Sequence, residues 1–477
     1  MIVLIAKAEW MQLRRDGRLV AVLVMTVLLG LAAALSGYAS VQQLEAERAL
    51  AETTDRTVWD NQGEKNPHTA AHFSRYVFQP MPTLALFDPG LGDHLGRAIW
   101  VEAHFRDPAT LRAVEDKIEL QRIAEFSPAW IFQVLAPLLA VLLGASAIAA
   151  ERERGTLRQI MSSGVTPLGL FAGKSIAAVS VTVLLFPSLI AAFAMILLSD
   201  HALILSATPV RLGLLFLFYA LYILAFIGLA IGLSSRFKRA KSALVLLAAI
   251  WAVSVLFLPR LAGDLAVKAA PAPAAATFAS RLRAESGDPF WGDTEEAVNR
   301  RDGIESGLLD QYGVESADQL PINLDGYLLQ ASEEFANDVF DRRYGQLWDS
   351  YETHADFVRG FSVLSPRIAL SNISMALSGT SLADYRHFAD KAELYRRDFV
   401  KRLNEDMIQN AGPEGYGYVT DDSFWRSLPD FSYEPPTLGS ALANIWVDIL
   451  VLFGWFIVAV GFSLSGFSYS FRQEAMA

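Results

Sequence analysis

Histidines are the residues of this chain whose type and spacing come nearest to a metal site. Four of the seven gather in one polar stretch: His68, His72, His94 and His104. On a helix, His68 and His72 would share one face, as a pair of metal ligands requires, and Asp88 and Asp93 add carboxylates nearby. Pro67 and its turn-forming neighbours argue against a helix, however. We therefore expect hydrogen-bonded or solvated histidines and no bound metal, with a metal site as the alternative.

Gly169, Gly173, Lys174 and Ser175 superficially resemble a phosphate-binding loop. That loop needs four residues between its glycines and a strand before them. Here three residues separate Gly169 from Gly173, and an apolar stretch follows. We expect no nucleotide site, and Lys174 instead to mark the edge of a membrane span. No nucleophile elbow, zinc-protease helix or paired-carboxylate spacing occurs, so the sequence does not support an enzyme.

The composition excludes several classes of protein. Of the 477 residues, 53% are hydrophobic, which is too apolar for an ordinary soluble chain and too polar for one that lies wholly in a membrane. The formal net charge of −11 argues against nucleic acid as a partner. The sequence has no cysteine, which excludes disulfides, thiolate metal sites and cysteine nucleophiles.

Long apolar stretches predict membrane-spanning helices, each of which needs roughly 20 mostly apolar residues. Six stretches qualify: 19–38, 129–150, 175–198, 212–233, 242–258 and 443–465. Pro137 and Pro187 fall inside the second and third, where we expect kinks because proline removes a backbone donor. The sequence therefore predicts an all-α membrane protein with six transmembrane helices.

The distribution of Lys and Arg predicts the orientation, because these residues are retained in cytoplasmic loops. They gather before the first span, in residues 151–174, between the fourth and fifth spans, and in the tail 466–477. The short loop 199–211 on the opposite side carries one. We expect both termini in the cytoplasm. Small residues around Gly37 resemble a signal-peptide cleavage site, but the apolar run is longer than in signal peptides and further spans follow.

Residues 1–18 predict an amphipathic helix along the inner membrane surface, with Trp10 at the headgroup level. Its apolar residues recur at helical spacing, with basic residues among them: Ile2, Ile5, Ala6, Trp10 and Leu13, with Lys7, Arg14 and Arg15. The alternative is a cytoplasmic extension of the first span.

On this topology two long polar segments, 39–128 and 259–442, lie outside the cytoplasm. Asp107 and Pro108 predict the start of a helix that leads to the second span. In the second segment, 324–351 and 382–407 carry apolar and aromatic residues at helical spacing. We expect the segments to pack into one mainly helical extracytoplasmic domain whose core contains those aromatic residues.

Two polar residues, Asn444 and Asp448, fall in the first half of the predicted sixth span. A carboxylate inside a membrane is costly and is a functional candidate by default. Asp448 could instead lie at the outer interface and be hydrated. The sequence leaves both interpretations open.

Charged residues interrupt the apolar pattern between the second and third spans: Glu151, Arg152, Glu153, Arg154, Gly155, Thr156 and Leu157. The two glutamates offer acceptors to a partner and the arginines offer donors. Gly155 permits a sharp change of direction, and Thr156 can cap the helix that follows. Residues 151–174 thus predict a cytoplasmic element that a soluble partner could push, with an ordinary charged loop as the alternative.

This loop, together with Gly164, Gly173 and Lys174, resembles the pattern of ABC type-2 transporter permeases. In that family a cytoplasmic helix after the second span docks into a groove on a separate ATPase subunit. The large insertions after the first and fifth spans are similar to those of a bacterial subfamily with a large extracytoplasmic domain. The permease of the nitrous-oxide reductase maturation system is a distant relative on this interpretation, but it lacks such insertions, so its substrate is not carried over.

The resemblance implies a permease subunit of an ATP-driven transporter in the bacterial inner membrane. It implies that ATP and Mg bind to the partner ATPase and that this chain holds no cofactor and is not an enzyme. The implied partners are that ABC ATPase, a second identical or similar permease chain, the lipid bilayer and a periplasmic protein. Two alternatives stay open: a mechanotransmitter that acts on a periplasmic partner without transport, and an ATP-independent receptor or scaffold.

Overall fold

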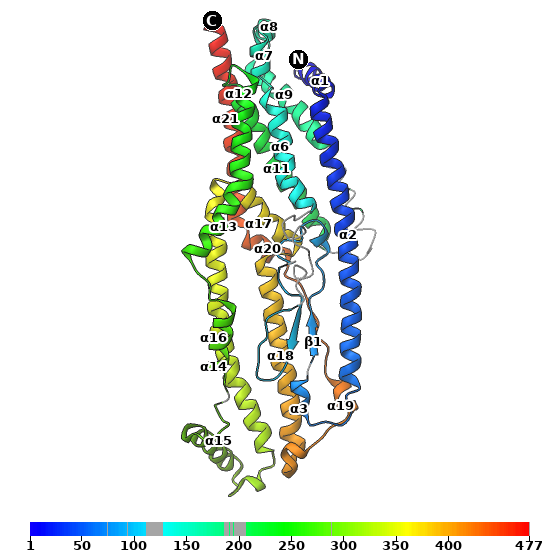
Figure 1. Ribbon diagram of the computed structural model, residues 1–477, viewed down its shortest axis with the longest axis vertical. Coiled ribbons are helices and arrows are strands. Elements are labelled where there is room, and N and C mark those ends of the chain that lie inside the picture. The colour runs from blue at the N-terminus through cyan, green and yellow to red at the C-terminus, as the bar shows by residue number, and fades with distance from the viewer. Residues whose placement is uncertain are drawn as a thin grey trace.

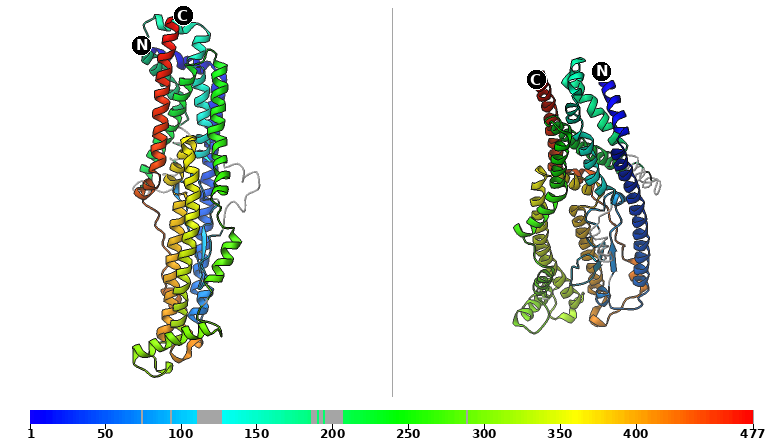
Figure 2. Two further views of the ribbon diagram at one scale, coloured as in Figure 1. Left: turned by 90° about the vertical axis from the view of Figure 1, so that its left-hand side faces the viewer. Right: turned by 45° about the horizontal axis from the view of Figure 1, so that its top comes forward.

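The computed structural model describes residues 1–476 except 74, 93, 111–126, 186–189, 191–193, 195–206 and 288. Most elements are α-helices that run along one long axis (Figure 1). The apolar helices lie towards one end of this axis and the polar helices towards the other. Both termini and the short helices α7 (Ala149–Glu153) and α8 (Thr156–Ser162) lie at the apolar end, and Figure 2 shows the two termini there from other sides.

Five of the described helices are long and apolar enough to cross a membrane. The first is Leu19–Asp60 within α2 (Gly17–Asp60), and the second is Pro128–Glu153, which comprises α6 (Pro128–Ala145) and α7. The third is α11 (Thr208–Ser234), and the fourth is Ala240–Ala269, which comprises α12 (Ala240–Trp251), η3 (Ala252–Phe257) and α13 (Leu258–Ala269). The last is Trp446–Gln473 within α21 (Trp446–Met476). The expected all-α membrane protein is confirmed in this respect.

The predicted third span, 175–198, is described only in its first part. There the chain forms α9 (Pro167–Val183), a shorter apolar helix. Pro187 and most of the rest of this span lie outside the described residues. The third span, and with it the total of six, therefore stays a prediction. The helix expected to start at Asp107 and Pro108 does not start there: residues 107–110 are not helical, because Thr110 pairs with Ala98 in a β-bridge, and residues 111–126 lie outside the described residues.

Several helix ends differ from the predicted ones. α2 continues past 38 to Asp60, because the polar residues that follow favour helix and pair along it, as Arg48 does with Glu45 and Glu52. The fifth apolar helix continues past 258 to Ala269 through the π-helical turn η3. The sixth begins later than 443, since α20 (Leu438–Asn444) ends at a break before α21.

The N-terminal helix α1 (Ile2–Arg15) is separated from α2 by Asp16, which has an extended backbone. Its apolar residues Val3 and Leu4 are 76% and 70% exposed. Exposed apolar side chains on a helix that also carries Arg14 and Arg15 suit a position on a membrane surface. The break at Asp16 favours a separate helix over an extension of the first span.

The polar end consists mainly of two long helices, α16 (Leu324–Gly360) and α18 (Leu382–Asn410). Shorter helices surround them: α3 (Pro67–His72), α14 (Ala275–Glu285), α15 (Glu295–Tyr312) and α19 (Asp422–Ser427). A small antiparallel sheet joins β1 (Arg75–Phe78) to β2 (Ala98–Val101), with Arg75 opposite Val101. These strands were not predicted from the sequence.

Both polar segments contribute to one hydrophobic core. Trp59 of α2 lies with its ring 5.0 Å from that of Phe399 on α18 and 5.5 Å from that of Trp425 on α19. The Trp59 indole also donates to the Trp425 carbonyl at 3.0 Å. The polar residues after the first span and those after the fifth therefore fold together.

α17 (Pro366–Ser378) joins this polar domain to the apolar helices. At its start, Ser365 donates to the carbonyl of Ser254 at 2.5 Å and Arg367 to that of Val255 at 2.7 Å, both within the π-helical turn. At its end, Arg211 of α11 donates to the carbonyl of Ala376 at 3.2 Å. Irregular backbone at membrane depth requires such protein donors, because lipid offers none.

Candidate functional site

The charged residues after the second span form a helical hairpin, in which α7 ends and α8 begins around Gly155. Gly155 has a φ of +75°, in the left-handed region that favours glycine, and turns the chain sharply. Thr156 donates its hydroxyl to the carboxylate of Glu151 and, at 3.1 Å, to the Glu151 carbonyl. Leu157 is buried beneath the turn. Residues 151–157 are thus a folded element rather than an extended loop.

Glu151 points into the protein and is only 6% exposed. Its Oε1 lies 3.2 Å from Nζ of Lys174 on α9, and the same Nζ lies 2.6 Å from Oε2 of Glu9 on α1. Lys174, expected at the edge of a span, is therefore a buried residue in the middle of α9. One ammonium between two carboxylates joins α7, α9 and α1, so Glu151 serves the fold here and does not face a partner.

The neighbouring charges also bind within the chain. Arg152 donates to the carbonyl of Phe237 at 2.7 Å and to the hydroxyl of Ser470 at 2.8 Å. The Glu153 carboxylate accepts from the backbone N–H of Ala240 at 3.2 Å, at the start of α12. α7 is thus tied to α12 and α21 as well as to α1 and α9. A displacement of α7 would move four other helices.

The outward side of the hairpin carries different residues. Arg154, Arg158, Gln159, Ser162 and Ser163 are exposed. These residues are polar or basic, and they lie at the same end of the molecule as both termini (Figure 1). A partner at this end would meet the arginines, α8 and the exposed Glu153, whose carboxylate also accepts from Ala240, whereas Glu151 is buried.

The residues that resemble a phosphate loop lie inside α9, which starts at Pro167. A β-carbon at Gly173 would meet the Ile5 side chain at 2.6 Å, so this glycine lets α1 pack closely on α9. Lys174 is held by the two carboxylates. The described residues around Gly169 therefore form a helix-packing contact and provide no cradle for phosphate.

Asn444 and Asp448, expected in one span, lie on two helices. Asn444 ends α20 and is exposed. Asp448 lies in the first turn of α21 and is fully buried, with Oδ2 3.1 Å from Nε of Arg359 and Oδ1 2.9 Å from Nδ2 of Asn372. Asp448 is thus paired with residues of the polar domain and is not a solvated carboxylate.

A chain of polar side chains among the apolar helices was missed by the sequence reasoning. The amide of Gln133 on α6 donates to the hydroxyl of Tyr219 at 3.1 Å, which lies 3.0 Å from that of Ser374. Tyr222 donates to the Gln133 carbonyl at 2.8 Å. In a regular helix the backbone carbonyl of Gln133 would accept from the N–H of residue 137, but Pro137 has no N–H, so the Tyr222 hydroxyl takes that place. The position of Pro137 in the sequence therefore indicates that the Gln133 carbonyl needs a donor from another helix.

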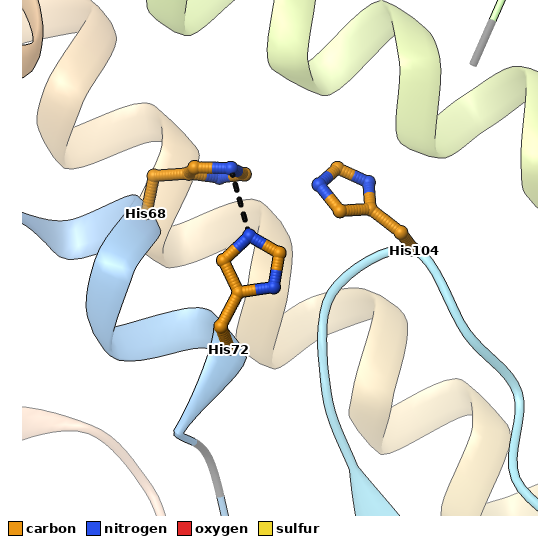
Figure 3. Close-up of side chains that lie close together, drawn as sticks. All are labelled: His68, His72 and His104. Atoms are coloured by element: carbon orange, nitrogen blue, oxygen red, sulfur yellow. Dashed lines mark hydrogen bonds between the residues drawn. The ribbon is translucent and has the colours of Figure 1, made fainter.

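Three of the four predicted histidines come together at the polar end (Figure 3). His68, His72 and His104 each offer one ring nitrogen, and these nitrogens all lie within 4.8 Å of one another. Burial lowers the pKa of His68 to about 4, and the other two imidazoles add to the effect. His94 lies apart, at a cavity of about 350 Å³ that Arg106, Asp107 and Trp348 also line. Asp93 lies outside the described residues.

Comparison with known proteins places this architecture in a family. The family model described as "ABC-2 family transporter protein" matches residues 3–476. No curated protein matches the chain. The expected kinship with the nitrous-oxide reductase maturation permease therefore stays a prediction.

Proposed function

The chain belongs to the ABC-2 transporter family, and from that premise we propose that the hairpin of α7 and α8 is where a separate ABC ATPase drives it. As a member of this family it is a multi-pass membrane permease of an ABC system. The ATPase supplies ATP and Mg, and this chain works beside a second, identical or similar permease chain. Its substrate crosses the bacterial inner membrane between the two.

One observation carries this proposal: the hairpin has an exposed outer side and a charged, buried inner side. Outside, Arg154 and Arg158 are exposed at the surface that a partner would contact, and Arg154 also lies 3.4 Å from the Glu151 carboxylate. Inside, Glu151 is bound to Lys174, which also binds Glu9. Charge-assisted hydrogen bonds of this kind are short and strong, so a displacement of α8 should be transmitted directly to α1 and α9.

The position of the hairpin supports the orientation that we propose. Both termini and the hairpin share one end of the molecule, and the polar domain forms the other end (Figures 1 and 2). Basic residues favour the cytoplasmic side of a membrane. We therefore assign the end with α7 and α8 to the cytoplasm and the domain of α16 and α18 to the periplasm.

Charge reversal at the exposed side tests the ATPase contact. In Arg154→Glu with Arg158→Glu, we expect at least tenfold weaker capture of the ABC ATPase that is co-expressed with the chain, and an equal loss of its stimulated ATP hydrolysis. Lys401→Glu with Arg402→Glu is the matched control, because both side chains are exposed on α18 at the far end. Unchanged capture by the first variant, in protein that still unfolds at the wild-type temperature, would refute the assignment.

A second candidate function, mechanical transmission without transport, is favoured by α2. This helix runs unbroken from Gly17 to Asp60, so a tilt at its membrane end moves the core around Trp59. The cysteine-free sequence allows spin labels at Leu50→Cys and Val245→Cys, both exposed positions. A label distance that changes under ATP hydrolysis, while reconstituted vesicles transport nothing, favours transmission. A constant distance contradicts it.

A further inference from the structure

Three imidazoles converge at the end of the molecule that lies farthest from the α7–α8 hairpin. His68 and His72 come from α3, and His104 comes from the loop after β2. Their rings face one another in Figure 3, with Nε2 of His72 3.2 Å from Nε2 of His68. His68 and His104 have ring centroids 5.2 Å apart, as do His72 and His104. Nitrogen donors from two separate segments thus surround one point.

Local structure explains how α3 presents its pair. The side chain of Asn66 accepts from the backbone N–H groups of His68 and Thr69, and Pro67 occupies the first helical position. A capping asparagine followed by proline is a favourable helix start. The helix then places His68 and His72 on the same face, one turn apart.

The third ring is held by unusual backbone and by a buried carboxylate. Among the described residues, only His104 combines a positive φ, +65°, with a residue type other than glycine. Glu333 of α16 accepts from its backbone N–H at 2.6 Å and lies 2.8 Å from its Nδ1. Backbone strain of this kind persists only where surrounding contacts fix it. Glu333 therefore sets the direction of the His104 ring.

His104 binds Glu333 through Nδ1, and its Nε2 faces the other two rings (Figure 3). Glu333 is only 3% exposed, and Arg396 balances its charge at 3.1 Å. A carboxylate that binds one imidazole nitrogen while the other faces a shared point is the arrangement that orients histidine ligands of metals.

One further distance points to a ligand at this place, and it involves Nε2 of His68. Zinc–nitrogen bonds of about 2.0–2.1 Å in a tetrahedral set separate the nitrogens by about 3.3 Å, close to the 3.2 Å between His68 and His72. In addition, the buried Nδ1 of His68 has no hydrogen-bond partner within the described part of the chain. The Nε2 atom of His68 is within hydrogen-bond distance of Nε2 of His72, so the neighbouring imidazole holds the ring of His68 in the cluster.

We propose that His68, His72 and His104 bind one divalent transition-metal ion of the zinc class, with Glu333 as the residue that positions His104. Three neutral imidazoles suit zinc and its neighbours, whereas calcium and magnesium prefer oxygen ligands. Three protein ligands leave a fourth position open. His72 is exposed, so a water or a small donor ligand reaches the ion from solvent.

Metal binding by the full-length protein tests the proposal directly. Chain purified in detergent without a histidine tag and stripped with a chelator is dialysed against Zn²⁺ and, separately, against Co²⁺. We expect one ion per chain and the visible absorption of four-coordinate Co²⁺. His72→Ala and His104→Ala should each weaken Zn²⁺ binding at least 100-fold. His94→Ala is the matched control, because His94 lies in the same segment but outside the cluster, and it should bind as the wild type does.

The role of Glu333 has its own readout. Glu333→Gln keeps the shape of the side chain and should weaken Zn²⁺ binding about 10–100-fold, as loss of such an outer carboxylate does. Its Co²⁺ spectrum should stay four-coordinate. Wild-type protein that binds Zn²⁺ no better than His72→Ala, equal loss in His94→Ala, or equal binding of Mg²⁺ would overturn the proposal. His72 is exposed, so His72→Ala is expected to fold, and its unfolding temperature verifies this.

Discussion

Arg359, in the last turn of α16, lies 3.1 Å from the fully buried carboxylate of Asp448 in the first turn of α21. Each charge also suits its helix end, since a carboxylate is favoured at an N-terminus and a guanidinium at a C-terminus. Asn372 of α17 donates to the same carboxylate at 2.9 Å. The pair therefore fastens the polar domain to the last apolar helix.

Removal of Asp448 should be costly, because Arg359 and Asn372 both lose the buried carboxylate that they bind, and Arg359 keeps only the exposed Asp356. For Asp448→Ala we expect a loss of about 3 kcal/mol in the free energy of unfolding, measured by denaturation in mixed micelles. Arg359→Leu combined with Asp448→Leu should recover most of that loss. The exposed pair of Arg260 and Asp264 supplies the control, since Asp264→Ala should change stability little. A small effect of Asp448→Ala would contradict the buried pairing.

A side chain at Gly155 should destabilise the hairpin through the backbone conformation of this residue. Its φ of +75° disfavours other residues, although a β-carbon there meets nothing within 4 Å. Gly155→Ala should therefore lower stability by about 1–2 kcal/mol through the backbone alone and reduce ATPase stimulation. Gly454→Ala is the control, because Gly454 lies in α21 with equally open space and ordinary helical backbone, and alanine favours helices. Equal behaviour of the two variants in thermal unfolding would argue against the turn.

Asp107 should make the polar domain less stable as the pH rises. Burial, and then the neighbouring Glu102 carboxylate, raise the pKa of Asp107 from 3.8 to about 6. The folded state thus favours the neutral acid, so its contribution is complete below about pH 4 and is lost as the pH rises through 6. The shift corresponds to about 3 kcal/mol, which water screening at this partly exposed group reduces to about 1 kcal/mol.

Asp107→Asn removes this titration. We expect the variant to unfold at a higher temperature than the wild type at pH 7.5, and the difference to shrink between pH 6 and pH 4.5. Asp318→Asn, at an exposed position in the same polar domain, is the control for a change of charge alone. If the two variants show the same pH profile, Asp107 is not the group that titrates.

Local signals in the sequence were sufficient for the long polar helices. α16 begins at Leu324 because Asn323 accepts from the N–H of Gly326, and α18 begins after the capping box of Ser381 and Asp384. Both starts are those that the apolar spacing predicted. The start of α3 could also be predicted, because Asn66 before Pro67 is a favourable helix start; the prediction that Pro67 argues against a helix is wrong.

Partners distant in the sequence could not be predicted in this way. Glu151 pairs with Lys174, and Lys174 pairs with Glu9, which lies 165 residues earlier in the sequence. His104 reaches His68 and His72 only because Glu333 turns its ring. The spacing of residues along the sequence does not predict such long-range contacts, because they depend on how α1, α9 and α16 pack. The sequence identified the charged hairpin, but only the packing shows which of its charges face outward.

Pro137 and Tyr222 should prove energetically coupled, because the tyrosine supplies the donor that the proline lacks. In the wild type, Tyr222→Phe leaves the buried Gln133 carbonyl without a partner and should cost about 1–3 kcal/mol. In a Pro137→Ala background the restored backbone N–H at position 137 can donate to that carbonyl, so the same change should cost well under 1 kcal/mol. A double-mutant cycle measured by unfolding in micelles gives the coupling directly. Tyr219→Phe serves as the comparison, since its hydroxyl meets side chains rather than this carbonyl, and its cost should not depend on residue 137. An additive cycle for Tyr222 would mean that another group already satisfies Gln133.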